Sequence, residues 1–114
     1  MPHFVIDCSK NVTSLQSPEF VMKSVFEAAE STGLFKKEDI KVRINPFEHY
    51  IVGGRKDDFI HVFANIMEGR NTEQKRDLSK KVVQTLKSLF PDVPILSINI
   101  RDFEKATYCN KQIV

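Results

Sequence analysis

The chain has 114 residues, of which 41% are hydrophobic and 28% charged, and its formal net charge at pH 7 is +2. These values are ordinary for a globular protein, so we expect a single domain over residues 1–114. The small net charge argues against nucleic-acid binding, and no stretch approaches the roughly 20 apolar residues that span a bilayer. The first residues lack the basic and apolar regions of a signal peptide, and Cys8 and Cys109 match no metal-binding spacing. We therefore expect a cytoplasmic protein with reduced thiols, no metal, and no membrane or nucleic-acid partner.

The first predicted strand covers residues 2–8 (PHFVIDC) and begins with a proline directly after Met1. Proline has no N–H group to donate, and the first position of a strand is one of the few places where a sheet tolerates it. A helix is predicted to begin at residues 17–19 (SPE), which supply an N-cap, a proline at N1 and an acid in the first turn. Gly33 stands where the C-terminal cap of this helix belongs. The apolar stripe of the helix consists of Val21, Met22, Val25, Phe26, Ala28 and Ala29.

The next strand is predicted around residues 40–45, where apolar and polar residues alternate. Pro46 should end this strand or mark it as an edge strand. Residues 52–58 (VGGRKDD) read as a turn, and residues 59–67 (FIHVFANIM) as a third, more buried strand.

A second helix is predicted after Asn71, which is followed three residues later by Gln74, as in a capping box. Pro91 lies just beyond its expected end, and residues 95–103 (ILSINIRDF) form the fourth predicted strand. The remaining residues, 104–114, show no periodicity. The apolar face of this helix is formed by Leu78, Val82, Leu86 and Leu89.

The predicted elements form two β-α-β units, at about residues 2–47 and 57–103, with hardly any sequence identity between them. In each unit the two strands should be parallel and joined by a right-handed crossover. We therefore expect an α/β fold with a four-stranded sheet and both helices on one face. The other face is left uncovered, which usually indicates a partner.

Several short motifs recur in an order that resembles the 5-carboxymethyl-2-hydroxymuconate isomerase family of the tautomerase superfamily. They are MPHF at the start, a cysteine near the end of the first strand, TGLF after the first helix, FIHV in the third strand, GR before the second helix and KQ near the C-terminus. The resemblance extends over nearly the whole chain. None of these motifs alone is specific for the family, but a proline after Met1 combined with two β-α-β units is much more specific for it.

The resemblance implies a cofactor-independent isomerase of aromatic-compound catabolism that assembles as a homotrimer enclosing a central barrel. In such enzymes the amino-terminal proline is the general acid and base, which moves a proton between oxygen and carbon of an unsaturated di- or tricarboxylate. Here that residue is Pro2, once Met1 has been removed. A terminal amine titrates near ~7.7–8.0, and burial and neighbouring cations lower its pKa, so the amine becomes a suitable proton carrier near neutral pH.

Three cations are the expected clamp for the substrate's carboxylates and for the charge of the dienolate. Arg70, in the GR motif, is the first choice because its guanidinium can bind a carboxylate bidentately. Lys41 and Arg43 share the polar face of the second strand, roughly 6.6 Å apart. The resemblance puts arginine at both positions, so Lys41 departs from the pattern and leaves the identity of the substrate open.

Other residues are weaker candidates. Lys10 mirrors Arg70 in the first β-α-β unit, but a solvated lysine is the simpler interpretation. His3 and His61 lie in apolar strands, where hydrogen-bonded core histidines are commoner than catalytic ones. Two alternative functions stay open: a tautomerase of another substrate, such as phenylpyruvate, and a non-catalytic interaction protein on the same fold. Retention of Met1 would favour the last of these.

Overall fold

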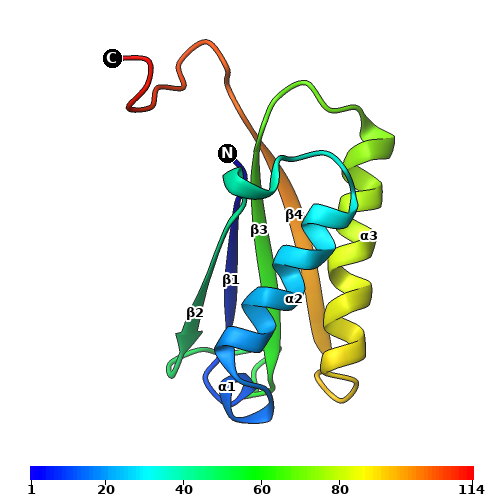
Figure 1. Ribbon diagram of the computed structural model, residues 1–114. Helices are drawn as coiled ribbons and strands as arrows, with labels where there is room; N and C mark the ends of the chain where they lie inside the picture. The colour runs from blue at the N-terminus through cyan, green and yellow to red at the C-terminus, as the bar shows by residue number, and fades with distance from the viewer.

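The computed structural model describes residues 1–114, and it contains two β-α-β units that form one four-stranded sheet (Figure 1). The first unit consists of β1 (His3–Ser9), α1 (Val12–Leu15), α2 (Pro18–Ser31), the 3₁₀ turn η1 (Lys37–Asp39) and β2 (Lys41–Phe47). The second consists of β3 (Phe59–Met67), α3 (Thr72–Leu89) and β4 (Ile95–Phe103). The predicted α/β fold is confirmed.

The sheet order is β2-β1-β3-β4. The strands within each unit are parallel, as predicted, whereas β1 and β3 pair antiparallel and join the two units. This antiparallel junction places the beginning of β1 beside the end of β3. Pro46 lies inside β2, which is an edge strand, so the edge alternative for this proline is the correct one.

The sequence signals for the helix ends have the predicted structures. The Ser17 side chain accepts a hydrogen bond from Phe20 N at the start of α2, and Gly33 follows that helix with a positive φ of 72°. Asn71 and Gln74 form a complete capping box at the start of α3. The short helix α1 was not predicted, because Val12 is its only buried apolar residue.

Helices α2 and α3 both cover the same face of the sheet, and the core lies between them and the strands (Figure 1). Alternate residues of the two central strands, such as Phe4, Ile6, Val62 and Ala64, are fully buried on this face. They form a single cluster of 18 buried residues with most of the predicted helix stripes, and Met22, Phe26 and Leu89 of those stripes are partly buried against it. None of the helices combines the length and the apolar character that a membrane crossing requires.

The opposite face carries no helix, and we call it the uncovered face. Most side chains on the uncovered face are polar or charged, although a sheet face without helices was expected to be apolar enough to pack against a partner. His61 is half-buried there, and its two ring nitrogens lie 2.6 Å from Ser97 Oγ and 2.6 Å from Asn99 Oδ1. It is hydrogen-bonded, as predicted, but on this face and not in the core. The uncovered face includes His3, Val5, Asp7, Lys41, Arg43, Asn45, His61, Phe63, Asn65, Ser97, Asn99 and Arg101.

Candidate active site

Pro2 lies at the beginning of β1, beside a cavity of about 400 Å³. Three parts of the chain meet here: the first residues, the connection from α2 to β2, and the end of β3 with the residues after it. They meet because β1 and β3 run antiparallel, so that the residues following β3 arrive next to the start of β1. The cavity is lined by Met1, Pro2, Leu34, Phe35, Lys36, Asp39, Met67 and Arg70.

Arg70 is the predicted clamp residue that shares this cavity with Pro2. Its guanidinium donates to the carbonyl oxygen of Leu34 at 2.7 Å and to that of Met67 at 3.2 Å. The same group lies over the Phe35 ring, with its central carbon 5.0 Å from the ring centroid. These partners are neutral, so the side chain is held in place while its full positive charge and further N–H groups stay available for an anion.

Lys41 does not line the cavity, but its ammonium group lies close to the amino terminus. Lys41 Nζ donates to the carbonyl oxygen of Asp39 at 2.6 Å, and the Met1 ammonium donates to the same oxygen at 3.0 Å. The Lys41 backbone N–H also donates to the Pro2 carbonyl at 3.1 Å. Two cations therefore meet at one carbonyl oxygen, next to the position where the Pro2 amine would be.

The electrostatics of this region disfavour a charged amine. Burial, followed by the charge of Lys41, lowers the pKa of the Met1 amine below its usual value, and Arg70 adds a smaller effect in the same direction. The Asp39 carboxylate, 3.9 Å from the amine, opposes the shift but does not cancel it. An amine at this position is therefore easier to deprotonate than a free one in water.

Arg43 faces away from the cavity. Its Nη1 lies 3.1 Å from His3 Nδ1 on the uncovered face, where burial and the charges of Arg43 and Lys41 lower the pKa of His3. The strand register explains the separation, since Lys41 and Arg43 pair with His3 and Val5 and so share their face. Pro2 precedes His3 and belongs to the opposite set of alternating positions, which faces the helices.

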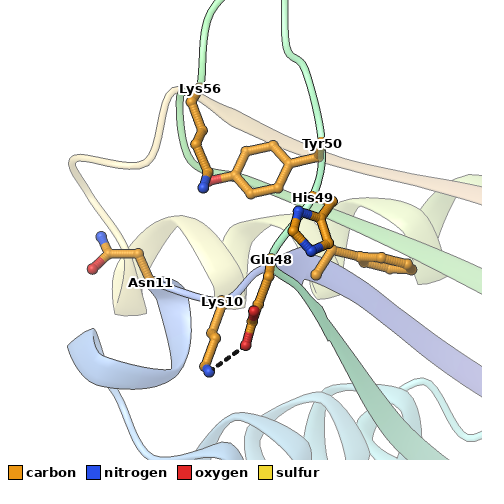
Figure 2. Close-up of a pocket in the computed structure, with 7 residues that line it drawn as sticks. Lys10, Asn11, Glu48, His49, Tyr50 and Lys56 are labelled. Atoms are coloured by element: carbon orange, nitrogen blue, oxygen red, sulfur yellow. Dashed lines mark hydrogen bonds and ion pairs between the residues drawn. The ribbon is translucent and has the colours of Figure 1, made fainter.

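A second cavity, of about 390 Å³, lies at the opposite end of β1, and Figure 2 shows its lining residues. Lys10, the weaker candidate of the sequence analysis, is part of it, and its ammonium is 2.6 Å from Glu48 Oε1. The hydrogen bond from Lys10, followed by its charge, lowers the pKa of the Glu48 carboxyl, and the carboxylate compensates the positive charge of the lysine. Lys10 therefore does not join Pro2. The remaining lining residues are Asn11, Phe47, His49, Tyr50 and Lys56.

Several residues of the Pro2 cavity were not predicted as site residues. Leu34 and Phe35 belong to the TGLF motif, which gave a signal for the resemblance but not for a role. Asp39 and Lys36 lie in the connection around η1, whose sequence has no periodicity that would place it. Only the tertiary structure brings these residues next to Pro2.

Comparisons with a family model and with a curated protein point to the same family. The family model for 5-carboxymethyl-2-hydroxymuconate isomerase matches residues 2–113. The 5-carboxymethyl-2-hydroxymuconate Delta-isomerase of Escherichia coli is 23% identical over 92 residues, which is 79% of this chain and 73% of that protein.

Solved structures share the fold at lower identity. A 5-carboxymethyl-2-hydroxymuconate isomerase from Deinococcus radiodurans R1 superposes with a TM-score of 0.84 at 21% identity, covering 96% of this chain and 88% of the other. The wild-type fused 4-OT protein W0, a symmetric trimer, superposes with a TM-score of 0.82 at 13% identity, covering 98% and 95%.

Proposed function

The chain belongs to the 5-carboxymethyl-2-hydroxymuconate isomerase family, and from that premise we propose that it isomerises a small unsaturated acid with several carboxylates. One observation carries the proposal: Pro2 and Arg70, far apart in the sequence, line the same cavity. A substrate such as 5-carboxymethyl-2-hydroxymuconate would bring both the proton to be moved and the carboxylates to be bound.

In this proposal Pro2 becomes the amino terminus when Met1 is removed. Its secondary amine, neutral at the working pH, takes a proton from the enol oxygen of the substrate. The resulting ammonium returns a proton to carbon, so that the amine is regenerated and no cofactor is consumed. The lowered pKa of the Met1 amine, one residue away, supports such a role, because the same burial and cations would favour the neutral, proton-accepting form of the Pro2 amine.

Arg70 is proposed to bind a carboxylate and to stabilise the negative charge of the dienolate. Its guanidinium is already fixed by two carbonyl oxygens, so little rotamer entropy is lost when the substrate binds. Lys41 would act mainly through its charge on the amine. Arg43, which faces away from the cavity of its own chain, would join the clamp only at the site of a neighbouring subunit.

We also propose a homotrimer, as the resemblance implies. The uncovered face and the trimeric fused 4-OT protein of the same fold support this assembly. Light scattering at micromolar concentration measures it directly, and a particle of about the 13.1 kDa chain mass would contradict it.

The function is tested by the turnover of two substrates with protein whose mass shows that Met1 is absent. We expect isomerisation of 5-carboxymethyl-2-hydroxymuconate to exceed tautomerisation of phenylpyruvate, since Arg70 and Lys41 favour the more highly charged acid. The reverse preference would indicate a tautomerase of a different substrate. No turnover of either, with Met1 retained in protein from its native host, would favour the non-catalytic alternative.

A further inference from the structure

We propose that the second cavity, at the end of β1 that lies far from Pro2, binds a small aromatic acid with a single carboxylate. Its volume of about 390 Å³ is within the range of small-molecule sites in proteins. This site is separate from the proposed isomerase site, because the two cavities have no lining residue in common. Binding here can therefore be tested whether or not the chain isomerises any substrate.

Two aromatic rings form the apolar part of the second cavity. Phe47, the last residue of β2, is 40% exposed although its side chain is large and apolar. Tyr50, in the connection that follows, packs edge-to-face against Phe59, with the ring centroids 5.3 Å apart. This contact holds the Tyr50 ring at the edge of the cavity. Two rings beside an open cavity favour a ligand that is itself planar and aromatic.

Lys56 supplies the positive charge that a carboxylate needs. Its Nζ lies 5.5 Å from the centroid of the Tyr50 ring, and it takes part in none of the ion pairs of the chain. A ring face orients an ammonium group without cancelling its charge, so the N–H groups of Lys56 stay available for an anion. The carboxylate of a ligand would thus lie next to the aromatic surface that holds its ring.

The other charges of the cavity limit the ligand to one negative group. Figure 2 shows Lys56 and Tyr50 above the open space and the ion pair of Lys10 with Glu48 below it, where the two atoms are 2.6 Å apart. The hydrogen bond from Lys10, then its charge and, less strongly, that of Lys56 lower the pKa of the Glu48 carboxyl. Glu48 is therefore ionised at neutral pH, and it would repel a second negative group on the ligand.

The walls of the cavity are fixed by one carboxylate behind them. Asp58 accepts a hydrogen bond from Ser9 Oγ at 2.8 Å and one from Asn11 Nδ2 at 2.9 Å. The Phe59 N–H donates to the same Ser9 hydroxyl at 3.2 Å. These bonds join the end of β1 to the start of β3, and so they hold both ends of the loop region that surrounds the cavity. A cavity that is already formed loses little conformational freedom when a ligand binds.

Binding is tested by titrating benzoate into the native protein and recording amide ¹H–¹⁵N NMR spectra. Resonances of residues 47–50 and 56 report on the second cavity, and those of residues 34–36 and 70 report on the Pro2 cavity. We expect benzoate to shift the first set. Benzamide lacks the charge and cyclohexanecarboxylate lacks the aromatic ring, so both should bind more weakly, benzamide by about tenfold.

Three variants assign the charge that holds benzoate. Lys56→Met should weaken binding at the second cavity by about tenfold. Lys23→Met is the matched control, because Lys23 is an exposed lysine of α2 that lines neither cavity, and it should leave the affinity unchanged. Arg70→Ala removes a cation from the Pro2 cavity, and the shifts of residues 47–50 should persist in it. The dispersion of each spectrum shows whether the variant is folded.

The role of Glu48 gives the opposite sign. Glu48→Gln removes the negative charge and releases Lys10, so benzoate should bind more tightly than it does to the native protein. Terephthalate, which carries a second carboxylate, should bind the native protein more weakly than benzoate does, and this difference should become smaller in the variant. An unchanged difference would show that Glu48 does not limit the charge of the ligand.

Two results would overturn the proposal as a whole. The first is benzoate binding that shifts only residues 34–36 and 70, or that Lys56→Met leaves unchanged. The second is inorganic phosphate that shifts residues 47–50 and 56 at the same concentrations as benzoate, because the cavity would then bind anions without regard to an aromatic ring.

Discussion

Two cavities of similar volume lie at opposite ends of β1, and Arg70 in one differs from Lys10 in the other in how its positive charge is compensated. At the Pro2 end, the partners of Arg70 are two carbonyl oxygens and an aromatic ring. At the other end, Lys10 is paired with the carboxylate of Glu48, and both side chains are more than half exposed. A carboxylate partner cancels a charge, whereas carbonyl partners only orient it. A cation with neutral partners is thus the better indication of an anion-binding site, even though both cavities are rich in charged residues.

The largest effect is expected at the amine itself. Pro2→Ala should lower kcat by about two to four decades, because alanine provides a terminal amine of different basicity and position. The fold should be retained, since Pro2 donates no N–H to the sheet. Stopped-flow or steady-state turnover, with the melting temperature measured in parallel, checks this prediction. Turnover close to that of the native protein would remove Pro2 from the mechanism.

Arg70→Ala should cost about one to two decades in kcat/KM, as a charge-assisted bidentate contact is worth roughly 1.5–3 kcal/mol. Arg70→Lys should recover part of this loss, because lysine keeps the positive charge but cannot bind a carboxylate bidentately. The loss should be larger for a dianionic substrate than for a monoanionic one.

The contacts of Arg70 with two carbonyl groups make a structural role the competing interpretation. An equal loss for both substrates, together with a fall in melting temperature, would show that Arg70 only holds the connection after α2 against the end of β3.

A smaller effect is expected for Lys41, and it should be seen mainly in the pH profile. The charge of Lys41 lowers the pKa of the Met1 amine, and we expect it to act in the same direction on the Pro2 amine once Met1 is removed, so Lys41→Met should raise the pKa of the Pro2 amine. Since the neutral amine is the active base, kcat/KM of the variant should begin to rise at a higher pH than in the native enzyme. A profile that keeps its position but loses height would assign Lys41 to substrate binding instead.

The smallest effect is expected at the other end of β1. Lys10→Met should change kcat/KM by less than about twofold and leave the melting temperature nearly unchanged, because exposed ion pairs contribute little. This variant is also the charge-matched control for Arg70→Ala. A loss in kcat/KM as large as that of Arg70→Ala would mean that the second cavity contributes to function, and the contrast between the two ends would no longer hold.

Local signals in the sequence determined most of the secondary structure. The cap at Ser17, the capping box at Asn71 and Gln74, and the alternation in the strands each depend on neighbouring residues, so they can be read without the rest of the chain. The pairing of Pro2 with Arg70 was predicted only through the resemblance. The alternation in the strands also indicates which residues face the helices. Pro2 lies two residues before the buried Phe4 and four before the buried Ile6, so its side chain is expected on their face, whereas Lys41 and Arg43 lie on the polar face.

What only the tertiary structure decided is where these residues lie relative to one another. The antiparallel pairing of β1 with β3 brings Arg70 to Pro2, and the register of β1 with β2 turns Arg43 toward the uncovered face. Both depend on hydrogen bonds between segments far apart in the chain, and a shift of one residue in register would move every side chain of a strand to the other face. The sequence by itself therefore determined the elements and the kind of residues at the site, while the sheet pairing determined which of them share a cavity.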